Sequence, residues 1–274
     1  MLLEGHRLLI TGVSTTDSIA FHAARQAQEQ GAEVILTAPD RARSFTEQAA
    51  AELPRAVEVL RLDVTEPGQF DALREELGSR WDAVDGVLHA IAYAPGEALG
   101  GKFLQTSAKA AMRAFEVSAF SYKALADALL PLLERSERRP ALVGLDFHGE
   151  VSWPIYDWMG VAKAALGSVN RYLARYLGPR GVRCNLVAAG PLRTVSATAI
   201  PGFDELASLW EIQAPLGWDW NDPVPTARAV CLLLSPWSSG ITGEIVHVDG
   251  GFHAMGAPLQ SNLATLIGEP VPAT

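Results

Sequence analysis

The stretch that decides the fold is Arg7–Ala20, which reads RLLITGVSTTDSIA. Its first part, Arg7–Thr11, is an apolar run typical of a buried strand, and Gly12 follows where the backbone has to turn sharply. Ser18 occupies the position of a helix N-cap, and the helical stretch after it ends at Gly31. A strand, a glycine turn and a helix in this order predict the first unit of a parallel α/β sheet.

Strands and helices alternate along the rest of the chain. The expected strands are Glu33–Thr37, Val57–Leu62, Val84–Ile91, Ala141–Leu145, Val182–Val187 and Glu244–Val248. The expected helices are Arg41–Leu53, Pro67–Arg80, Ala108–Leu133, Pro154–Leu177 and Val224–Leu234, with irregular structure between Gly190 and the last helix. This pattern predicts an α/β fold, a doubly wound (Rossmann-type) parallel sheet with helices on both faces. No linker interrupts it, so we expect a single domain over residues 1–256 and a flexible tail over 257–274.

Composition and charge exclude several classes of protein. Of 274 residues, 49% are hydrophobic and 19% are charged, which is typical of a globular protein. The net charge of −9 disfavours nucleic-acid binding, which needs clustered lysine and arginine. No apolar stretch approaches the roughly 20 residues that cross a bilayer. There is no recognisable secretion signal, and two cysteines are too few for a disulfide framework. We therefore expect a cytoplasmic protein without membrane insertion.

The first turn is a candidate phosphate site. Ligands of a doubly wound sheet bind beyond the carboxyl ends of its strands, where this turn lies. Gly12 permits the sharp turn, and the amides of Ser18 and Ile19 open a helix whose N-terminus attracts a pyrophosphate. However, the loop has a single glycine and lacks the usual G-x-G-x-x-G pattern. An ordinary loop in which Ser18 only caps the helix therefore stays an alternative.

Two further strand ends fall at the same edge of the sheet. Asp63 and Val64 follow the third strand, where the carboxylate could accept a hydrogen bond from an adenine amine or could instead cap the next helix. Ala90, Ile91 and Ala92 close the fourth strand, and small residues there would let a ribose lie against the backbone. Together with the first turn, these positions favour a dinucleotide site.

The segment after the fifth strand carries a tyrosine and a lysine at an informative spacing. We expect Pro154 to begin a helix, so that Tyr156 and Lys163, seven residues apart, project from one face of it. An ammonium near a phenol lowers the pKa of the phenol and can also hold ribose hydroxyls, which suits proton transfer beside a nicotinamide. The alternative is that the aromatic side chains of this segment simply pack the helix against the sheet.

With these residues the chain resembles the enoyl-acyl-carrier-protein reductases of the divergent short-chain dehydrogenase/reductase type, which act in bacterial type II fatty-acid synthesis, and among them the actinobacterial NADH-dependent members. A seven-residue Tyr–Lys separation distinguishes that group from ordinary family members, where the separation is four. The resemblance covers residues 5–255 and rests on Thr11-Gly12 with Ser18-Ile19-Ala20, Tyr156-x-x-Met159-x-x-x-Lys163, Asn185-Leu186-Val187-Ala188-Ala189-Gly190-Pro191, Arg193-Thr194 and Val248-Asp249-Gly250-Gly251.

The resemblance implies roles for individual residues. Tyr156 would donate a hydrogen bond to the thioester carbonyl, Lys163 would hold the nicotinamide ribose, and Phe147 would lie beside the nicotinamide and the substrate. The implied cofactor positions are Gly12, Ser18, Ile19, Asp63, Val64, Ile91, Ala92, Lys163, Leu192 and Thr194. The implied reaction is NADH-dependent reduction of the 2,3-double bond of a trans-2-enoyl thioester, on acyl carrier protein or coenzyme A, by a homotetramer. No metal is implied, and the six histidines show no metal-ligand spacing.

Some positions depart from the family pattern. Ala38 ends the second strand where long-chain relatives place an aromatic under the adenine, and Arg41 and Arg43 nearby keep NADPH as an alternative cofactor. The substrate loop, residues 194–215, is shorter than in mycobacterial long-chain members, which favours shorter acyl chains. This loop also lacks the basic residues that many relatives use to bind carrier protein. The tryptophans in and just after it, Trp210, Trp218 and Trp220, either line an acyl crevice or fill core.

Two other functions are alternatives to enoyl reduction. Carbonyl reductases of the same fold carry a catalytic serine about thirteen residues before the tyrosine, where this chain has Val143 and then Gly144. They also tend to carry an asparagine where Ser118 stands. Both differences disfavour carbonyl reduction. A non-catalytic nucleotide-binding regulator is the second alternative, and the intact Tyr–Lys pair disfavours it.

Overall fold

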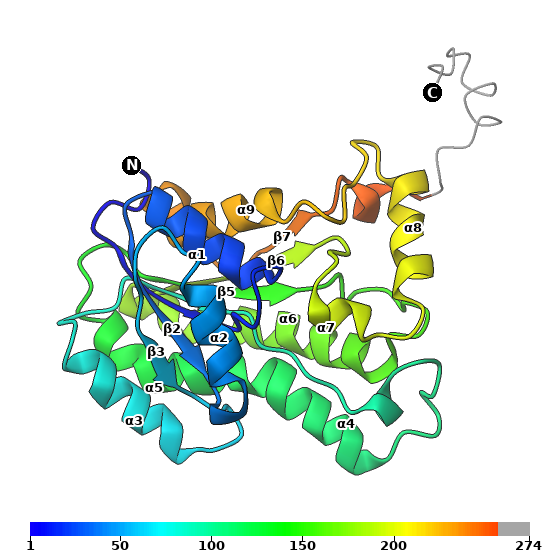
Figure 1. The fold of residues 1–274 in the computed structure, drawn as a ribbon, viewed down its shortest axis with the longest axis horizontal. Helices are drawn as coiled ribbons and strands as arrows, with labels where there is room; N and C mark the ends of the chain where they lie inside the picture. The colour runs from blue at the N-terminus through cyan, green and yellow to red at the C-terminus, as the bar shows by residue number, and fades with distance from the viewer. Residues whose placement is uncertain (257–274) are drawn as a thin grey trace.

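The computed structural model describes residues 1–256, which form a seven-stranded parallel sheet flanked by helices (Figure 1). The strands are β1 (Arg7–Thr11), β2 (Glu33–Ala38), β3 (Val59–Arg61), β4 (Gly86–His89), β5 (Ala141–Asp146), β6 (Arg183–Ala189) and β7 (Ile245–Val248). They lie in the order β3-β2-β1-β4-β5-β6-β7, so the direction of winding reverses between β1 and β4. The predicted doubly wound sheet is confirmed.

Helices cover both faces of this sheet. They are α1 (Ile19–Glu29), α2 (Arg43–Ala50), α3 (Gly68–Gly78), α4 (Ala108–Phe115), α5 (Ser121–Leu133), α6 (Asp157–Leu177), α7 (Val195–Thr198), α8 (Phe203–Gln213) and α9 (Val224–Leu234). On one face α1, α2 and α9 supply side chains such as Phe21 and Val230 to an apolar layer. On the other, α3, α5 and α6 supply side chains such as Leu125 and Leu166. Because both faces are buried, the strands are continuous apolar runs, which made them recognisable in the sequence.

The ends of β1 and β4 are joined by contacts that leave room for nothing larger than glycine. Thr11 Oγ1 donates to the Leu88 carbonyl at 3.0 Å and accepts from the Ala90 N–H at 3.1 Å. Gly12 has a φ of 81°, and a Cβ on it would lie 2.0 Å from the Ala90 carbonyl oxygen. The first turn is therefore held directly against the residues that follow β4, at the switch in strand order where a doubly wound sheet binds its ligand.

Three helices differ from the sequence prediction. The expected helix over 108–133 is divided into α4 and α5 by a π-helical turn, Glu116–Phe120. The helix expected from Pro154 begins three residues later, at Asp157, because Ile155 and Asp157 have positive φ angles that do not continue a helix backwards. The expected helix Arg41–Leu53 is shorter: a 3₁₀ turn precedes α2, which ends at Ala50.

The prediction of irregular structure after Gly190 is wrong, because α7 and α8 lie there. In α8 the buried residues Phe203, Leu206, Ala207 and Trp210 recur at helical spacing. The sequence therefore contained a signal for this helix. The helix α8 matters for the site because it places Trp210 against Phe147, the residue that follows β5.

Residues 1–256 contain neither a membrane-spanning helix nor a cluster of metal-binding side chains. No helix within 1–256 is both long enough and apolar enough to span a membrane. In the same part of the chain no three histidine, cysteine, aspartate or glutamate side chains are arranged to hold a metal ion. The expected flexible tail, residues 257–274, lies outside the described residues.

We predict that Gly12→Ala destabilises the fold by more than about 1 kcal/mol, because the new methyl group cannot coexist with the Ala90 carbonyl and the positive φ strains alanine. Gly68→Ala is the matched control: Gly68 lies in the first turn of α3 with open space around it, so this variant should be neutral or slightly stabilised. Urea unfolding of both variants measures the difference. Equal unfolding free energies for Gly12→Ala and Gly68→Ala would contradict the requirement for glycine at position 12.

Candidate active site

Tyr156 lies at the start of α6 in a backbone segment that is strained on both sides. Ile155 and Asp157 have φ angles of 63° and 42°, in the left-handed region that residues other than glycine rarely adopt. A neighbouring loop holds this segment, because the N–H groups of Gly101 and Lys102 donate to Asp157 Oδ2 at 2.7 and 2.9 Å. These contacts over-determine the conformation and fix the place of Tyr156. Sequence analysis did not single out Asp157, since its function depends on a loop that is distant along the chain.

Lys163 lies two helical turns further along α6 and is only 6% exposed. Its Nζ donates to the Leu145 carbonyl in β5 at 2.8 Å. The loop after β5 approaches α6 closely: a Cβ on Gly149 would lie 2.7 Å from the Ala164 nitrogen. The missing side chain at Gly149 thus allows α6 to bring the ammonium of Lys163 to the end of the strand.

Asp146, the last residue of β5, lies beside this buried ammonium. Its Oδ1 is fully buried and has no hydrogen-bond partner among residues 1–256. Burial raises the pKa of Asp146 to about 6, and the Lys163 ammonium opposes that rise. Burial also lowers the pKa of Lys163, and the Asp146 carboxylate opposes that change. Each group therefore favours the charged form of the other. Sequence analysis missed Asp146, although its position at a strand end was an available signal.

Tyr156, Lys163 and Phe147 come together at the end of β5. The rings of Phe147 and Tyr156 lie 5.1 Å apart between centroids, and Tyr156 and Lys163 are both electrostatically coupled to Asp146. The prediction that the lysine lowers the tyrosine pKa is wrong. Burial first, and the Asp146 carboxylate second, raise the pKa of Tyr156 above its ordinary value. The phenol is therefore a protonated hydrogen-bond donor at neutral pH.

A cavity of about 720 Å³ lies at the carboxyl ends of β1, β2, β3 and β4. It is lined by backbone and small side chains from the strand ends, and five of the expected cofactor positions are among them: Gly12, Asp63, Val64, Ile91 and Ala92. Because Gly12 has no Cβ, the first turn lies directly against the Ala90 carbonyl, and both segments contribute to this wall. Its size, its lining and its place in the sheet fit the adenosine part of a dinucleotide.

The carboxylate of Asp63 is already engaged in this structure. One oxygen accepts from the Thr65 N–H and hydroxyl at 3.1 and 2.8 Å, and the other pairs with the Arg41 guanidinium. Burial raises the pKa of Asp63, but these hydrogen bonds outweigh burial and the net pKa is lowered. The alternative named for Asp63, capping the next helix, is wrong: α3 is preceded by Pro67 and no side chain caps it, whereas Asp63 caps only the turn at Thr65. An adenine contact stays a prediction.

Hydroxyl groups cap two helices at the same edge of the sheet. Ser18 Oγ accepts from the Phe21 N–H at 3.4 Å and donates to the Thr15 carbonyl at 2.7 Å, so it caps α1, whose first residue is Ile19. Thr194 caps α7 by accepting a backbone N–H at 3.2 Å. Because the Ser18 proton is used within the loop, a bond from it to a pyrophosphate requires a rotation of the hydroxyl.

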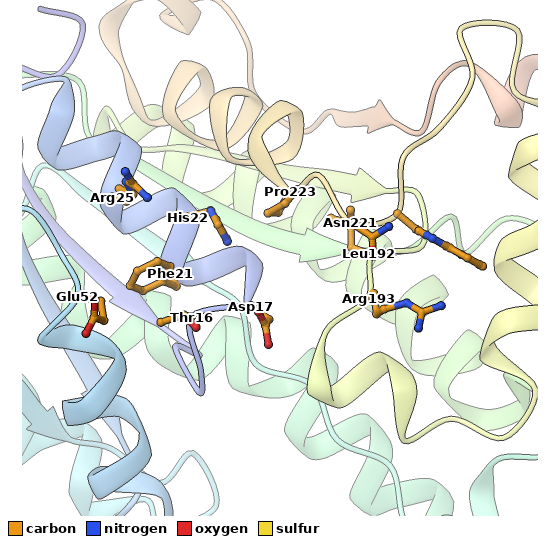
Figure 2. Close-up of a pocket in the computed structure, with 11 residues that line it drawn as sticks. Thr16, Asp17, Phe21, His22, Arg25, Glu52, Leu192, Arg193, Asn221 and Pro223 are labelled. Carbon is orange, nitrogen blue, oxygen red and sulfur yellow. The ribbon is translucent and has the colours of Figure 1, made fainter.

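A larger cavity, of about 890 Å³, lies between the start of α1, the segment after β6 and the loop before α9 (Figure 2). Phe21 and His22 of α1 form one wall, and Leu192 and Arg193 form part of the facing wall. Leu192 is an expected cofactor position, but the three expected catalytic residues do not line this cavity. Cavity size therefore does not identify the reacting centre, which we place by its chemistry at the end of β5.

The positions that would carry carbonyl reduction have other functions. Val143 and Gly144 are buried inside β5 and offer no hydroxyl to a substrate near Tyr156. Ser118 lies in the π-helical turn, where its hydroxyl accepts from the Tyr93 N–H and donates to the Tyr93 carbonyl, each at 3.0 Å. Ser118 therefore fixes the loop after β4, which lines the smaller cavity.

The sheet order, the Tyr–Lys pair on the helix after β5 and the cavity beyond the first turn together define a short-chain dehydrogenase/reductase fold. Comparison with known proteins makes this more specific. A family model described as enoyl-(acyl carrier protein) reductase matches residues 12–253. The chain belongs to this family.

Curated relatives agree with the family match. The chain is 41% identical over 264 residues to the enoyl-[acyl-carrier-protein] reductase [NADH] of Mycolicibacterium smegmatis, covering 91% of this chain and 97% of the relative. It is 39% identical over 253 residues to the protein of the same printed function from Neisseria meningitidis, covering 91% and 95%. The corresponding protein of Escherichia coli is 36% identical with the same coverage.

We predict that Asp146 makes the unfolding free energy depend on pH. Its folded pKa of about 6 lies above the ordinary 3.8, so its ionisation destabilises the folded state as pH rises through this range. The total effect is about 3 kcal/mol, of which about 2 kcal/mol falls between pH 4.5 and 7. Asp146→Asn removes this dependence. The other titratable neighbour of Lys163, His89, stays neutral because burial lowers its pKa to about 3.

Urea unfolding of wild type and Asp146→Asn at pH 4.5 and pH 7 measures this prediction. Between these pH values the wild type should lose about 2 kcal/mol relative to the variant. Because all other groups are shared, their titration cancels in the comparison. The same change with pH in both proteins would show that the carboxylate is not held at a raised pKa.

Proposed function

We propose that this protein is an NADH-dependent enoyl-acyl-carrier-protein reductase, which reduces the 2,3-double bond of a trans-2-enoyl thioester in fatty-acid synthesis. The observation that carries the proposal is the buried Tyr156–Lys163 pair at its seven-residue spacing, at the same edge of the sheet as a cavity that fits the adenosine part of a dinucleotide. The printed functions of the relatives support it. The buried Val143, where a carbonyl reductase needs a serine, disfavours the alternative reaction.

In the proposed mechanism, bound NADH supplies the hydride that is added to the β-carbon of the substrate. Tyr156 donates a hydrogen bond to the thioester carbonyl oxygen, on which negative charge develops as the enolate forms. Its raised pKa keeps the phenol protonated, so that it remains a hydrogen-bond donor to this oxygen. A proton taken from solvent at the α-carbon then converts the enolate to the saturated thioester. Phe147, packed against the Tyr156 ring, limits the access of water to the reacting atoms.

Lys163 and the strand ends would hold the cofactor. Besides the N–H donated to Leu145, the ammonium has further donors for the hydroxyls of the nicotinamide ribose. Asp146 supports the charged form of Lys163, as described above. The other proposed cofactor residues are Gly12, Ser18, Ile19, Asp63, Val64, Ile91, Ala92, Leu192 and Thr194, with no residue assigned to a metal.

The charges near the smaller cavity support NADH rather than NADPH. Arg41, which lines the cavity, pairs with Asp63, and Arg43 Nε donates to Glu47 at 2.8 Å. Both arginines that could bind a 2′-phosphate thus already have acidic partners. A 2′-phosphate would have to compete with these carboxylates and would be repelled by them.

We predict that the purified protein oxidises NADH in the presence of crotonyl coenzyme A, and does so much faster than with NADPH. Acetoacetyl coenzyme A, a carbonyl substrate, should give no turnover because the buried Val143 stands where a carbonyl reductase carries its catalytic serine. The loss of NADH absorbance measures both. Turnover of acetoacetyl coenzyme A alone would overturn the enoyl assignment, and NADH binding without turnover of either would favour the nucleotide-binding regulator.

Two variants serve as controls for this assay. Tyr156→Phe should lower kcat by about 100-fold or more, because it removes the donor to the developing oxyanion, while NADH affinity stays nearly unchanged. Lys163→Ala should weaken NADH binding by about tenfold or more, because it removes a charged hydrogen-bond donor. Normal NADH affinity in Lys163→Ala would show that its proposed function is wrong.

We also propose a homotetramer whose substrate is carried by acyl carrier protein. A closed tetramer with two kinds of two-fold interface needs two self-complementary faces, and two apolar faces are exposed. Met112, Phe120 and Val161 are 62%, 49% and 43% exposed on α4, the π-helical turn and α6. Trp237, 82% exposed, precedes the edge strand β7.

Light scattering of the purified protein tests the assembly. We expect a mass close to four times the 29.3 kDa of the chain. Trp237→Glu should reduce it to that of a dimer, because a charge would be buried in one of the two interfaces. A wild-type mass of a single chain would refute the tetramer.

A further inference from the structure

Four aromatic rings form a continuous cluster beside Tyr156. Phe147, which contacts Tyr156, has its centroid 5.2 Å from that of Trp153, and Trp153 lies 5.6 Å from Phe252. Trp210 of α8 stacks on Phe252, with centroids 3.9 Å apart and ring planes at 14°. Trp153 and Trp210 are also in contact, at 5.1 Å. We call these residues, Phe147, Trp153, Trp210 and Phe252, the aromatic cluster.

The aromatic cluster is closely packed and anchored to the body of the domain. Trp210 and Phe252 are 1% and 7% exposed. The Trp153 indole N–H donates to the His148 carbonyl at 2.6 Å. Phe252 follows the turn after β7, where Asp249 Oδ1 accepts a backbone N–H of the turn at 2.9 Å. A group that enters this region must therefore displace rings that are held in place.

The aromatic cluster offers an acyl chain bound at Tyr156 an extended apolar surface to run along. This step rests on the proposed function, in which Tyr156 binds the thioester carbonyl. The other groups coupled to Tyr156 and Lys163 are charged or polar, Asp146 above all, and a hydrocarbon chain avoids them. Among the apolar residues packed around Tyr156, Phe147 and Trp153 are the two that continue into a second apolar group, which reaches Phe252.

We propose that Trp153 and Phe252 determine the acyl-chain length by filling the space that the far end of a long chain would occupy. A crotonyl chain needs contact only with the rings nearest to Tyr156. A dodecenoyl chain needs the volume that the buried rings of the aromatic cluster take up, and moving them forfeits close packing. The enzyme accordingly reduces short 2-enoyl thioesters in preference to long ones.

Two truncations test this proposal by a gain of activity. The quantity measured is the ratio of kcat/KM for trans-2-dodecenoyl coenzyme A to that for crotonyl coenzyme A. In the wild type this ratio should be about 0.1 or less, and Phe252→Ala and Trp153→Ala should each raise it about tenfold or more. Removing a ring opens volume for the longer chain, whereas general damage to the fold would lower both activities together.

Phe70→Ala is the matched control. Phe70 belongs to the apolar layer that α3, α5 and α6 form on one face of the sheet, and it is 8% exposed. Phe70→Ala therefore removes an equally buried ring that is not part of the aromatic cluster. Its ratio should equal that of the wild type. If Phe252→Ala does not fold, the milder Phe252→Leu and Trp153→Phe replace the truncations, with a smaller rise expected.

The outcomes separate this proposal from the proposed function. A wild type that reduces dodecenoyl and crotonyl thioesters equally well, or folded variants with an unchanged ratio, would overturn the chain-length proposal while leaving enoyl reduction intact. A wild type that reduces neither substrate would instead refute enoyl reduction. A rise in the ratio for Phe70→Ala as large as that for Phe252→Ala would show that looser packing, not the cluster, admits long chains.

Discussion

A buried ammonium at the end of β5 is the constraint on which the site depends. Lys163 is nearly inaccessible, and a charge in such surroundings is costly unless other groups compensate for the lost water. The Leu145 carbonyl accepts a hydrogen bond from the ammonium, and Asp146 supplies the opposite charge. Gly149, by its close approach to α6, makes this arrangement sterically allowed. The ammonium keeps further donors, so the same features that stabilise it also leave it ready to bind a ligand's hydroxyl groups.

Tyr156 is positioned by its backbone conformation, whereas Lys163 is positioned by contacts of its side chain. The two left-handed residues on either side of it cost on the order of 1–3 kcal/mol each, and they persist because neighbouring groups hold them. Asp157 provides this restraint by accepting two N–H groups from the loop at Gly101. The lysine is thus fixed from the sheet and the tyrosine from the loop before α4. Because Tyr156 and Lys163 are two helical turns apart at the start of α6, both side chains are placed near the end of β5.

The sequence predicted the sheet, most helices and the Tyr–Lys pair, because these follow from local periodicity and spacing. It did not predict the conformation of Ile155 or the π-helical turn at Ser118, since both depend on contacts between distant segments. The direction of the Tyr156 pKa change was also wrong. From the sequence, Lys163 was its only visible neighbour, whereas burial and Asp146 dominate in the folded chain. The helix α8 was not predicted, although its apolar residues recur at helical spacing in the sequence.

The two halves of the site share one segment of chain. Ser196 of α7 lines the cavity that fits the adenosine, whereas Ile200, just after α7, packs with the apolar residues around Tyr156. The next helix carries Trp210 into the aromatic cluster. A group that contacts Ser196 in the cavity therefore touches the same segment whose Ile200 packs beside Tyr156. Because α7 has only one turn and is capped by Thr194 alone, its conformation depends more on such contacts than on its own helical stability.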